Sequence, residues 1–132
     1  MMATTYLLDS DVIIDALNGK SGRHLFLQGL LQEGRLLACC AVNVTEVYAG
    51  LRPHEEERTQ AFLDSLDYYP VSRETAREAG LLKRRWSRQG ITLSLADVTI
   101  AAVALANDLP LVTGNARHYP MPGLRLCPLP DR

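Results

Sequence analysis

Hydrophobic residues in this chain gather in short uninterrupted runs, separated by longer segments with helical periodicity. Apolar runs at residues 4–8, 36–40 and 111–113 predict buried strands, because a strand covered on both faces loses the usual alternation of apolar and polar positions. Shorter runs at residues 68–71 and 124–127 predict two further strands. Strands of this kind, separated by helices, are typical of parallel sheets.

Start and stop signals divide the intervening segments into helices. Gly34 and Gly90 are typical of residues that follow a helix, Pro53 of a first turn, and Ser72 and Ser94 of an N-cap. The predicted helices cover residues 11–17, 23–32, 42–51, 53 to about 66, 73–89 and 95–107. Helices alternating with buried strands predict an α/β fold, a three-layer α/β/α sandwich around a mostly parallel central sheet. We expect residues 1–132 to form one domain, with an irregular, proline-rich segment from residue 120 onward.

Composition excludes several classes of protein. The net charge is −1 and the pI about 6.3, so the chain has no overall positive field for nucleic acid. No apolar run reaches the ~18 residues of a membrane span. The first residues, Met-Met-Ala-Thr-Thr-Tyr, lack a basic region and a cleavage site, so we expect no signal peptide and a cytoplasmic location. The three cysteines have no zinc-site spacing and are expected to be buried, reduced thiols.

Four acidic or amide residues lie in apolar surroundings: Asp9, Glu46, Asp97 and Asn115. Asp9 and Asn115 follow predicted strands, and Glu46 and Asp97 lie in the first turns of helices. Ligand sites in parallel sheets form at the carboxyl ends of the strands, so one edge can gather all four. A carboxylate buried alone is costly, and two close together repel, so a bound cation with oxygen ligands is the simplest common reason.

Each of these residues also has a purely structural interpretation. Asp9 suits a turn or helix N-cap, and Asn115 a left-handed turn. Ser94 and Asp97 match a capping box. Glu46 lies on a helix that is apolar almost all round, which predicts burial and a need for a partner. Asp11 favours a helix N-terminus, and we expect it and Thr113 to be outer contacts of the site.

A basic stretch, Lys-Arg-Arg-Trp-Ser-Arg at residues 83–88, is a second candidate feature. A base can stack on an aromatic ring while nearby cations hold phosphates, as in single-stranded nucleic-acid binding. The candidate RNA contacts are Lys83, Arg84, Arg85 and Arg88. The structural alternative is a solvated helix face with Trp86 in the core.

Taken together, four segments resemble the motifs of PIN domains, and specifically of VapC-family toxins of type II toxin–antitoxin pairs. Tyr-Leu-Leu-Asp-Ser-Asp-Val-Ile-Ile-Asp (6–15) resembles the first motif, with its acid at Asp9. Residues 43–51 and 95–106 resemble the second and third motifs, with acids at Glu46 and Asp97. Residues 110–119 resemble the last motif, with Asn115 where an acid is common and His118 where Asp is common.

The resemblance implies a metal-dependent endoribonuclease that is inhibited by a cognate VapB-type antitoxin and forms homodimers. Asp9, Glu46 and Asp97 would bind Mg²⁺ or Mn²⁺, with Asn115 assisting, and RNA would be the substrate. Asn115 in place of an acid keeps open a second interpretation, a catalytically weak PIN-like module that binds RNA or protein. A third is a haloacid-dehalogenase-type phosphatase, with Asp9 as nucleophile and Asp11 as general acid; it lacks the late acidic pair that this chemistry needs.

Overall fold

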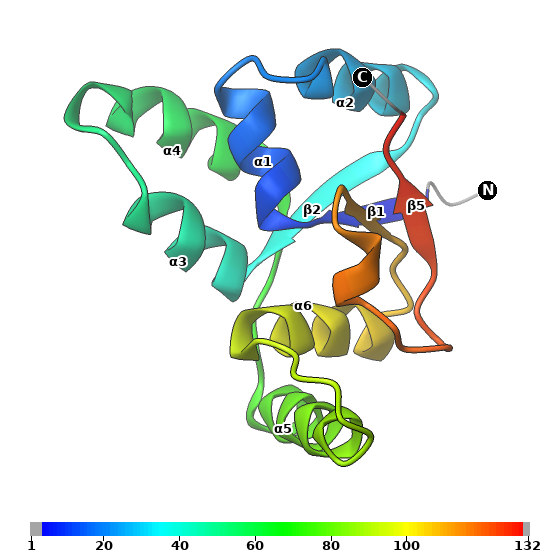
Figure 1. Cartoon of the computed structure of the whole chain (residues 1–132). Coiled ribbons are helices and arrows are strands. Elements are labelled where there is room, and N and C mark those ends of the chain that lie inside the picture. The colour runs from blue at the N-terminus through cyan, green and yellow to red at the C-terminus, as the bar shows by residue number, and fades with distance from the viewer. Residues whose placement is uncertain (1–3, 131–132) are drawn as a thin grey trace.

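A five-stranded parallel sheet forms the centre of the molecule in the computed structural model, which describes residues 4–130 (Figure 1). The strands are β1 (Thr5–Leu8), β2 (Leu36–Cys40), β3 (Asp67–Tyr69), β4 (Leu111–Thr113) and β5 (Leu126–Pro128). Their order across the sheet is β3-β2-β1-β4-β5, and every neighbouring pair is parallel. The expected sheet is therefore confirmed, and it is parallel throughout the described residues.

Helices cover both faces of the sheet and complete the predicted α/β/α sandwich. The helices are α1 (Ser10–Leu17), α2 (Arg23–Gln32), α3 (Ala41–Ala49), α4 (Glu56–Asp64), α5 (Arg73–Ser87) and α6 (Leu95–Ala106). Two short 3₁₀ turns, η1 (Pro53–Glu55) and η2 (Ala116–His118), complete the elements. Among the residues described, no helix is both long and apolar enough to cross a membrane.

Two separate cores lie on the two faces of the sheet. Helices α1 to α4 pack on one face, around buried residues such as Leu8 and Val12, and α5 and α6 pack on the other, around Leu7 and Val98. Neighbouring strand residues point to opposite faces, so Cys39 lies in the first core and Cys40 in the second. Buried runs without alternation are thus the consequence of burial on both faces.

Most predicted boundaries are correct to within two residues, and the differences have local causes. The helix expected from Pro53 to about residue 66 begins as η1 and continues as α4, which ends at Asp64. The helix expected over 42–51 is α3, which ends at Ala49 with Gly50 as its C-cap. The last strand begins two residues later and ends one residue later than expected, because it pairs Leu126 with Leu111 rather than Leu124. The segment after residue 120 therefore contains a strand as well as irregular structure.

Candidate metal-dependent active site

Asp9 lies at the carboxyl end of β1 and is fixed there by short hydrogen bonds. Its backbone nitrogen donates to the Val112 carbonyl at 2.9 Å, which continues the pairing of β1 with β4. The side chain caps α1 by accepting from Ser10 N at 2.8 Å, and its second oxygen accepts from the Thr113 hydroxyl at 2.7 Å. The residue is only 5% exposed. The capping interpretation is therefore correct, and the cap also holds the carboxylate at the centre of the site.

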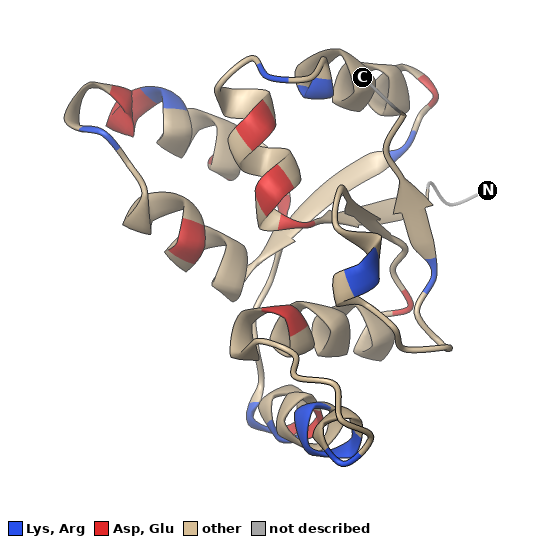
Figure 2. Ribbon diagram, viewed as in Figure 1, with Lys and Arg blue, Asp and Glu red and all other residues tan. Residues whose placement is uncertain are grey.

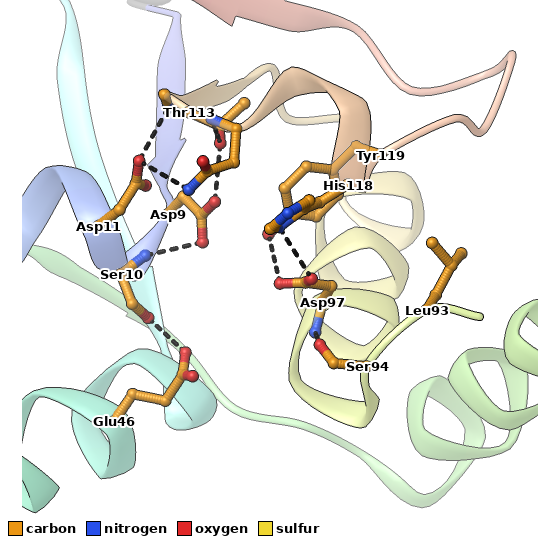
Figure 3. A network of polar contacts seen from close by, with 12 residues as sticks. Asp9, Ser10, Asp11, Glu46, Leu93, Ser94, Asp97, Thr113, His118 and Tyr119 are labelled. Carbon is orange, nitrogen blue, oxygen red and sulfur yellow. Dashed lines mark hydrogen bonds and ion pairs between the residues drawn. The ribbon is translucent and has the colours of Figure 1, made fainter. Parts of the chain in front are cut away.

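Glu46 reaches the same region through Ser10 (Figure 3). The Ser10 hydroxyl donates to Glu46 Oε1 at 2.6 Å and accepts from the Asn43 amide at 2.9 Å. Asn43 is completely buried, and its carbonyl oxygen accepts from Cys40 N at 2.8 Å. This chain of bonds joins the end of β2 to the start of α1 and holds the Glu46 carboxylate beside it.

The expectation that Glu46 lies on a buried helix is wrong. Glu46 is exposed, and within α3 only Asn43 and Val47 are fully buried. The helix begins directly at the end of β2 and contacts α1 and α6, and Figure 1 shows it extending away from the sheet. Apolar composition indicated that a helix face packs, but it did not show that the opposite face stays open to solvent.

Asp97 enters the site from the other helical layer. Its backbone nitrogen donates to the Ser94 hydroxyl at 3.0 Å, and Ser94 is the N-cap residue of α6. Its carboxylate instead turns toward the last motif, where Oδ1 accepts from the Tyr119 hydroxyl at 3.2 Å and Oδ2 lies 3.4 Å from His118 Nδ1. The cap and the site contact therefore use different groups of Asp97, so the two interpretations are compatible.

Tyr119 connects the two sides of the site. The ring is 3% exposed, and burial raises the pKa of its hydroxyl well above the usual range. The negative charges of Asp9 and Asp97 both raise this pKa further. The hydroxyl thus donates to Asp97 of α6, and its pKa also depends on the charge of Asp9, which follows β1.

Asp11 and Asn115 form the remaining part of the cluster. Asp11 Oδ2 accepts from Gly114 N at 3.0 Å and from the Asn115 amide at 3.2 Å, while Asn115 N donates to the Thr113 hydroxyl at 2.9 Å. Burial, followed by the charge of Asp9, raises the pKa of Asp11 to about 6. Asp11 Oδ1 is buried without a hydrogen-bond partner among the described residues. Asp11 is therefore joined to the last motif by two hydrogen bonds and keeps one oxygen without a partner among the described residues.

A divalent cation with oxygen ligands fits this donor set. The nearby side chains present carboxylate, amide and hydroxyl oxygens, which hard ions such as Mg²⁺ and Mn²⁺ prefer. Within residues 4–130, no three acidic, histidine or cysteine side chains lie close enough to enclose an ion by themselves. Magnesium sites commonly use one or two carboxylates together with waters and substrate phosphates, so an open arrangement suits it better than a closed cage. One Asp11 oxygen has no partner among the described residues, and the raised pKa of Asp11 shows that its negative charge is poorly compensated. A nearby divalent ion would compensate that charge.

The basic stretch lies on α5, the outer helix of the layer that carries Asp97 (Figure 2). Arg84, Arg85 and Arg88 are exposed, whereas the Lys83 ammonium donates to the Leu93 carbonyl just before α6. Trp86 is half-buried against the core. Lys83 thus has a structural contact, and the three arginines are the cations that face solvent.

Sequence reasoning missed three residues that organise the site: Ser10, Asn43 and Tyr119. Ser10 stands between two candidate acids, and Asn43 lies one helical turn before Glu46, on the same face. The positions of Ser10 and Asn43 beside the candidate acids could have indicated that they belong to the site. Tyr119 ends the last motif, but only the folded chain brings its hydroxyl to Asp97.

Comparison with known proteins agrees with this arrangement. The PIN domain family matches residues 6–124. The chain is 36% identical to Ribonuclease VapC10 of Mycobacterium tuberculosis over 115 residues, which cover 87% of this chain and 86% of the relative.

Solved structures share the fold. The crystal structure of VapBC2 from Rickettsia felis, bound to a DNA fragment from its promoter, has a TM-score of 0.81 at 21% identity and covers 96% of this chain and all of the other. A toxin–antitoxin complex from Klebsiella pneumoniae has a TM-score of 0.74 at 26% identity, with coverages of 90% and 94%. The haloacid-dehalogenase-type phosphatase alternative is not supported, because the family that matches the chain is the PIN domain. From its motifs, its parallel sheet and these matches, the chain belongs to the PIN-domain family, in the group of the VapC ribonucleases.

Proposed function

We propose that this chain is a Mg²⁺- or Mn²⁺-dependent endoribonuclease that acts in the cytoplasm as the toxin of a type II toxin–antitoxin pair. The observation that supports the proposal is a polar network at the end of the sheet, where Ser10 joins Asp9 to Glu46 of α3 and the Tyr119 hydroxyl bonds Asp97 of α6. The name of VapC10 and the two solved complexes support ribonuclease activity and a VapB-type antitoxin as partner. A homodimer is part of the same proposal.

Asp9, Glu46 and Asp97 would hold the ion, and Asp11 and Asn115 would add negative charge and an amide beside it. When bound, a divalent ion polarises the scissile phosphate and lowers the pKa of a water, which makes attack at phosphorus possible near neutral pH. Thr113 and Ser10 keep the Asp9 and Glu46 carboxylates in place before the ion or RNA arrives. Such preorganisation matters because misplacing a catalytic group by about 1 Å costs on the order of 100-fold in rate.

The direct test is Asp97→Asn, with Asp15→Asn as the matched control from outside the proposed site. We expect Asp97→Asn to lower RNA cleavage by about 100- to 1,000-fold, the scale expected when a main electrostatic group is lost. The Asp15→Asn variant should cleave at the unmodified rate, and EDTA should abolish cleavage until Mg²⁺ or Mn²⁺ is restored. Circular dichroism should show both variants folded. Undiminished cleavage in EDTA, or by folded Asp97→Asn, would remove the proposed mechanism.

Toxicity tests the biological role separately. Expression of the unmodified chain alone should arrest growth, and Asp97→Asn should relieve the arrest at equal protein level. Normal growth with an active, soluble chain would contradict the toxin role while leaving the nuclease chemistry intact. Binding of RNA without turnover in either metal would favour the alternative of a catalytically weak binding module.

A further inference from the structure

His118 is the one imidazole that faces the proposed metal site, among the described residues. It closes the turn η2 after β4, and its Nδ1 lies 3.4 Å from Asp97 Oδ2. Figure 3 shows the His118 ring and the Asp97 carboxylate pointing toward one another, the ring from η2 and the carboxylate from α6. The other two histidines lie elsewhere, His24 on α2 and His54 in η1.

The two oxygens of Asp97 have different surroundings. Oδ1 accepts the hydrogen bond from the Tyr119 hydroxyl at 3.2 Å. Oδ2 faces His118 at a distance beyond the usual 2.7–3.2 Å of a hydrogen bond from nitrogen. Oδ2, which accepts no hydrogen bond within residues 4–130, is therefore the oxygen more open to an ion, and it is the one that His118 faces.

The separation suits two ligands of a single ion. Adjacent donors of an octahedral ion with bond lengths of about 2.1 Å lie roughly 3.0 Å apart, so a pair at 3.4 Å needs only a small rotation to bind together. The His118 side chain is 46% exposed, so its ring turns without disturbing a core. Asp97 is held at its backbone by the Ser94 cap, which leaves its carboxylate to meet the ion.

We propose that His118 binds the active-site ion through nitrogen, beside Asp97, and thereby favours a transition ion such as Mn²⁺ over Mg²⁺. Imidazole suits first-row transition ions, whereas Mg²⁺ prefers oxygen and gives up its waters reluctantly. The proposed His118 ligand lies in the last motif, which carries the neutral Asn115 where an acid is common. This inference rests on the metal-dependent function proposed above, but it concerns which ion binds and through which atom.

Pulsed electron paramagnetic resonance of Mn²⁺ bound to the metal-stripped full chain tests the ligand directly, without RNA or turnover. We expect a ¹⁴N coupling typical of directly bound imidazole, lost in His118→Asn and kept in the matched control His54→Asn. Asp97→Asn should reduce binding of Mn²⁺ itself, which assigns the signal to this site. Labelling the histidines with ¹⁵N should change the coupling pattern accordingly.

Metal affinities test the consequence. In the unmodified chain we expect the ratio of Mg²⁺ to Mn²⁺ dissociation constants to exceed that of His118→Asn and His118→Asp by at least about 10-fold, a loss comparable to that of a ligand-supporting residue. His118→Asp should bind Mg²⁺ no more weakly than the unmodified chain, because it restores an oxygen ligand.

The outcomes separate this inference from the proposed function. If Mn²⁺ binds in an Asp97-dependent manner without any histidine nitrogen coupling, His118 is only an ion-pair partner and the inference is overturned, while the nuclease proposal stands. An unchanged metal preference in both His118 variants overturns it equally. If no ion binds in an Asp97-dependent manner, the proposed function falls as well.

Discussion

Individual residues in this site serve two purposes at once, one local and one chemical. Asp9 caps α1 and carries a central carboxylate, and Asp97 occupies the first turn of α6 while its side chain turns to Tyr119. The local preference places the backbone, and the remaining oxygens stay free for the site, because a carboxylate has several acceptor positions. A sequence pattern for capping and one for chemistry are therefore compatible in the same residue.

Gly114 leads to a prediction at this scale. A Cβ at this position would lie 2.7 Å from Asp11 Oδ2 and 3.4 Å from Leu129 Cδ1, so Gly114→Ala must displace the Asp11 carboxylate from its bonds to Gly114 and Asn115. We expect a loss of about 1–3 kcal/mol in the free energy of unfolding, measured by urea denaturation, together with weaker metal binding.

Gly80→Ala is the matched control, since a Cβ there meets nothing within 4 Å on an exposed position of α5. The helix interior should gain roughly 0.4–1 kcal/mol from the same substitution, with metal binding unchanged. Equal effects of the two substitutions would show that the close approach at Gly114 does not constrain the site.

At the scale of elements, the sequence of α5 predicts four RNA-contacting cations, whereas the structure divides them into one with a structural contact and three in solvent. Its basic end lies beside the loop before α6, where Lys83 bonds the Leu93 carbonyl, and its arginines remain in solvent. Trp86 packs partly against the core, so it is poorly available for stacking on a base. Backbone phosphate contacts by the arginines are the part of the RNA-binding prediction that this arrangement leaves open.

Replacing Arg84 and Arg85 together with Ala tests that part. If both neutralise phosphates, the slope of log affinity against log salt should fall in magnitude by about 1.4, which is roughly 0.7 for each contact with single-stranded RNA. Affinity is best measured by fluorescence anisotropy with the inactive Asp97→Asn chain. Arg73→Ala, at the opposite end of α5, should leave the slope unchanged. An unaltered slope in the double variant would remove α5 from the RNA-binding surface.

At the scale of the whole molecule, the sheet separates two cores that each contain one cysteine of the neighbouring pair. Burial, with a smaller contribution from Cys40, raises the pKa of Cys39 to about 11. Burial also raises the pKa of the Cys40 thiol, and nearby Glu46 and Asp9 add to the shift. Both thiols therefore stay protonated and unreactive near neutral pH while both helical layers remain packed.

Alkylation by iodoacetamide at pH 8, followed by mass spectrometry, tests whether the molecule behaves as one unit. Cys39 and Cys40 should react far more slowly than an unfolded thiol, and in rising urea they should become reactive together. The pKa of Cys39 is higher in the folded chain, about 11, than its value near 9 in the unfolded chain. The protonated Cys39 thiol therefore stabilises the folded state fully below pH 9, and this stabilisation is lost as pH rises through about 11. Cys40 reacting at lower urea than Cys39 would instead indicate that the α5–α6 layer opens first.

Much of the fold could be predicted because its signals are local. Apolar runs located β1, β2 and β4, and cap residues such as Ser72 and Ser94 located α5 and α6. Boundaries failed where a tertiary contact decided them, as at the last strand, whose register is set by pairing with β4. The prediction that α3 is buried failed for the same reason, since burial depends on which neighbours an element meets.

The order of strands and helices, the acids at their ends and the resemblance to PIN domains were determined by the sequence alone, because turn chemistry, capping and hydrophobic patterning act over a few residues. Only the tertiary structure decided which side chains contact these acids. It brought Ser10 between Asn43 and Glu46, set the Tyr119 hydroxyl near both Asp9 and Asp97, and turned His118 toward Asp97. Those contacts join residues far apart in the chain, and their geometry follows from strand pairing and packing on both faces of the sheet.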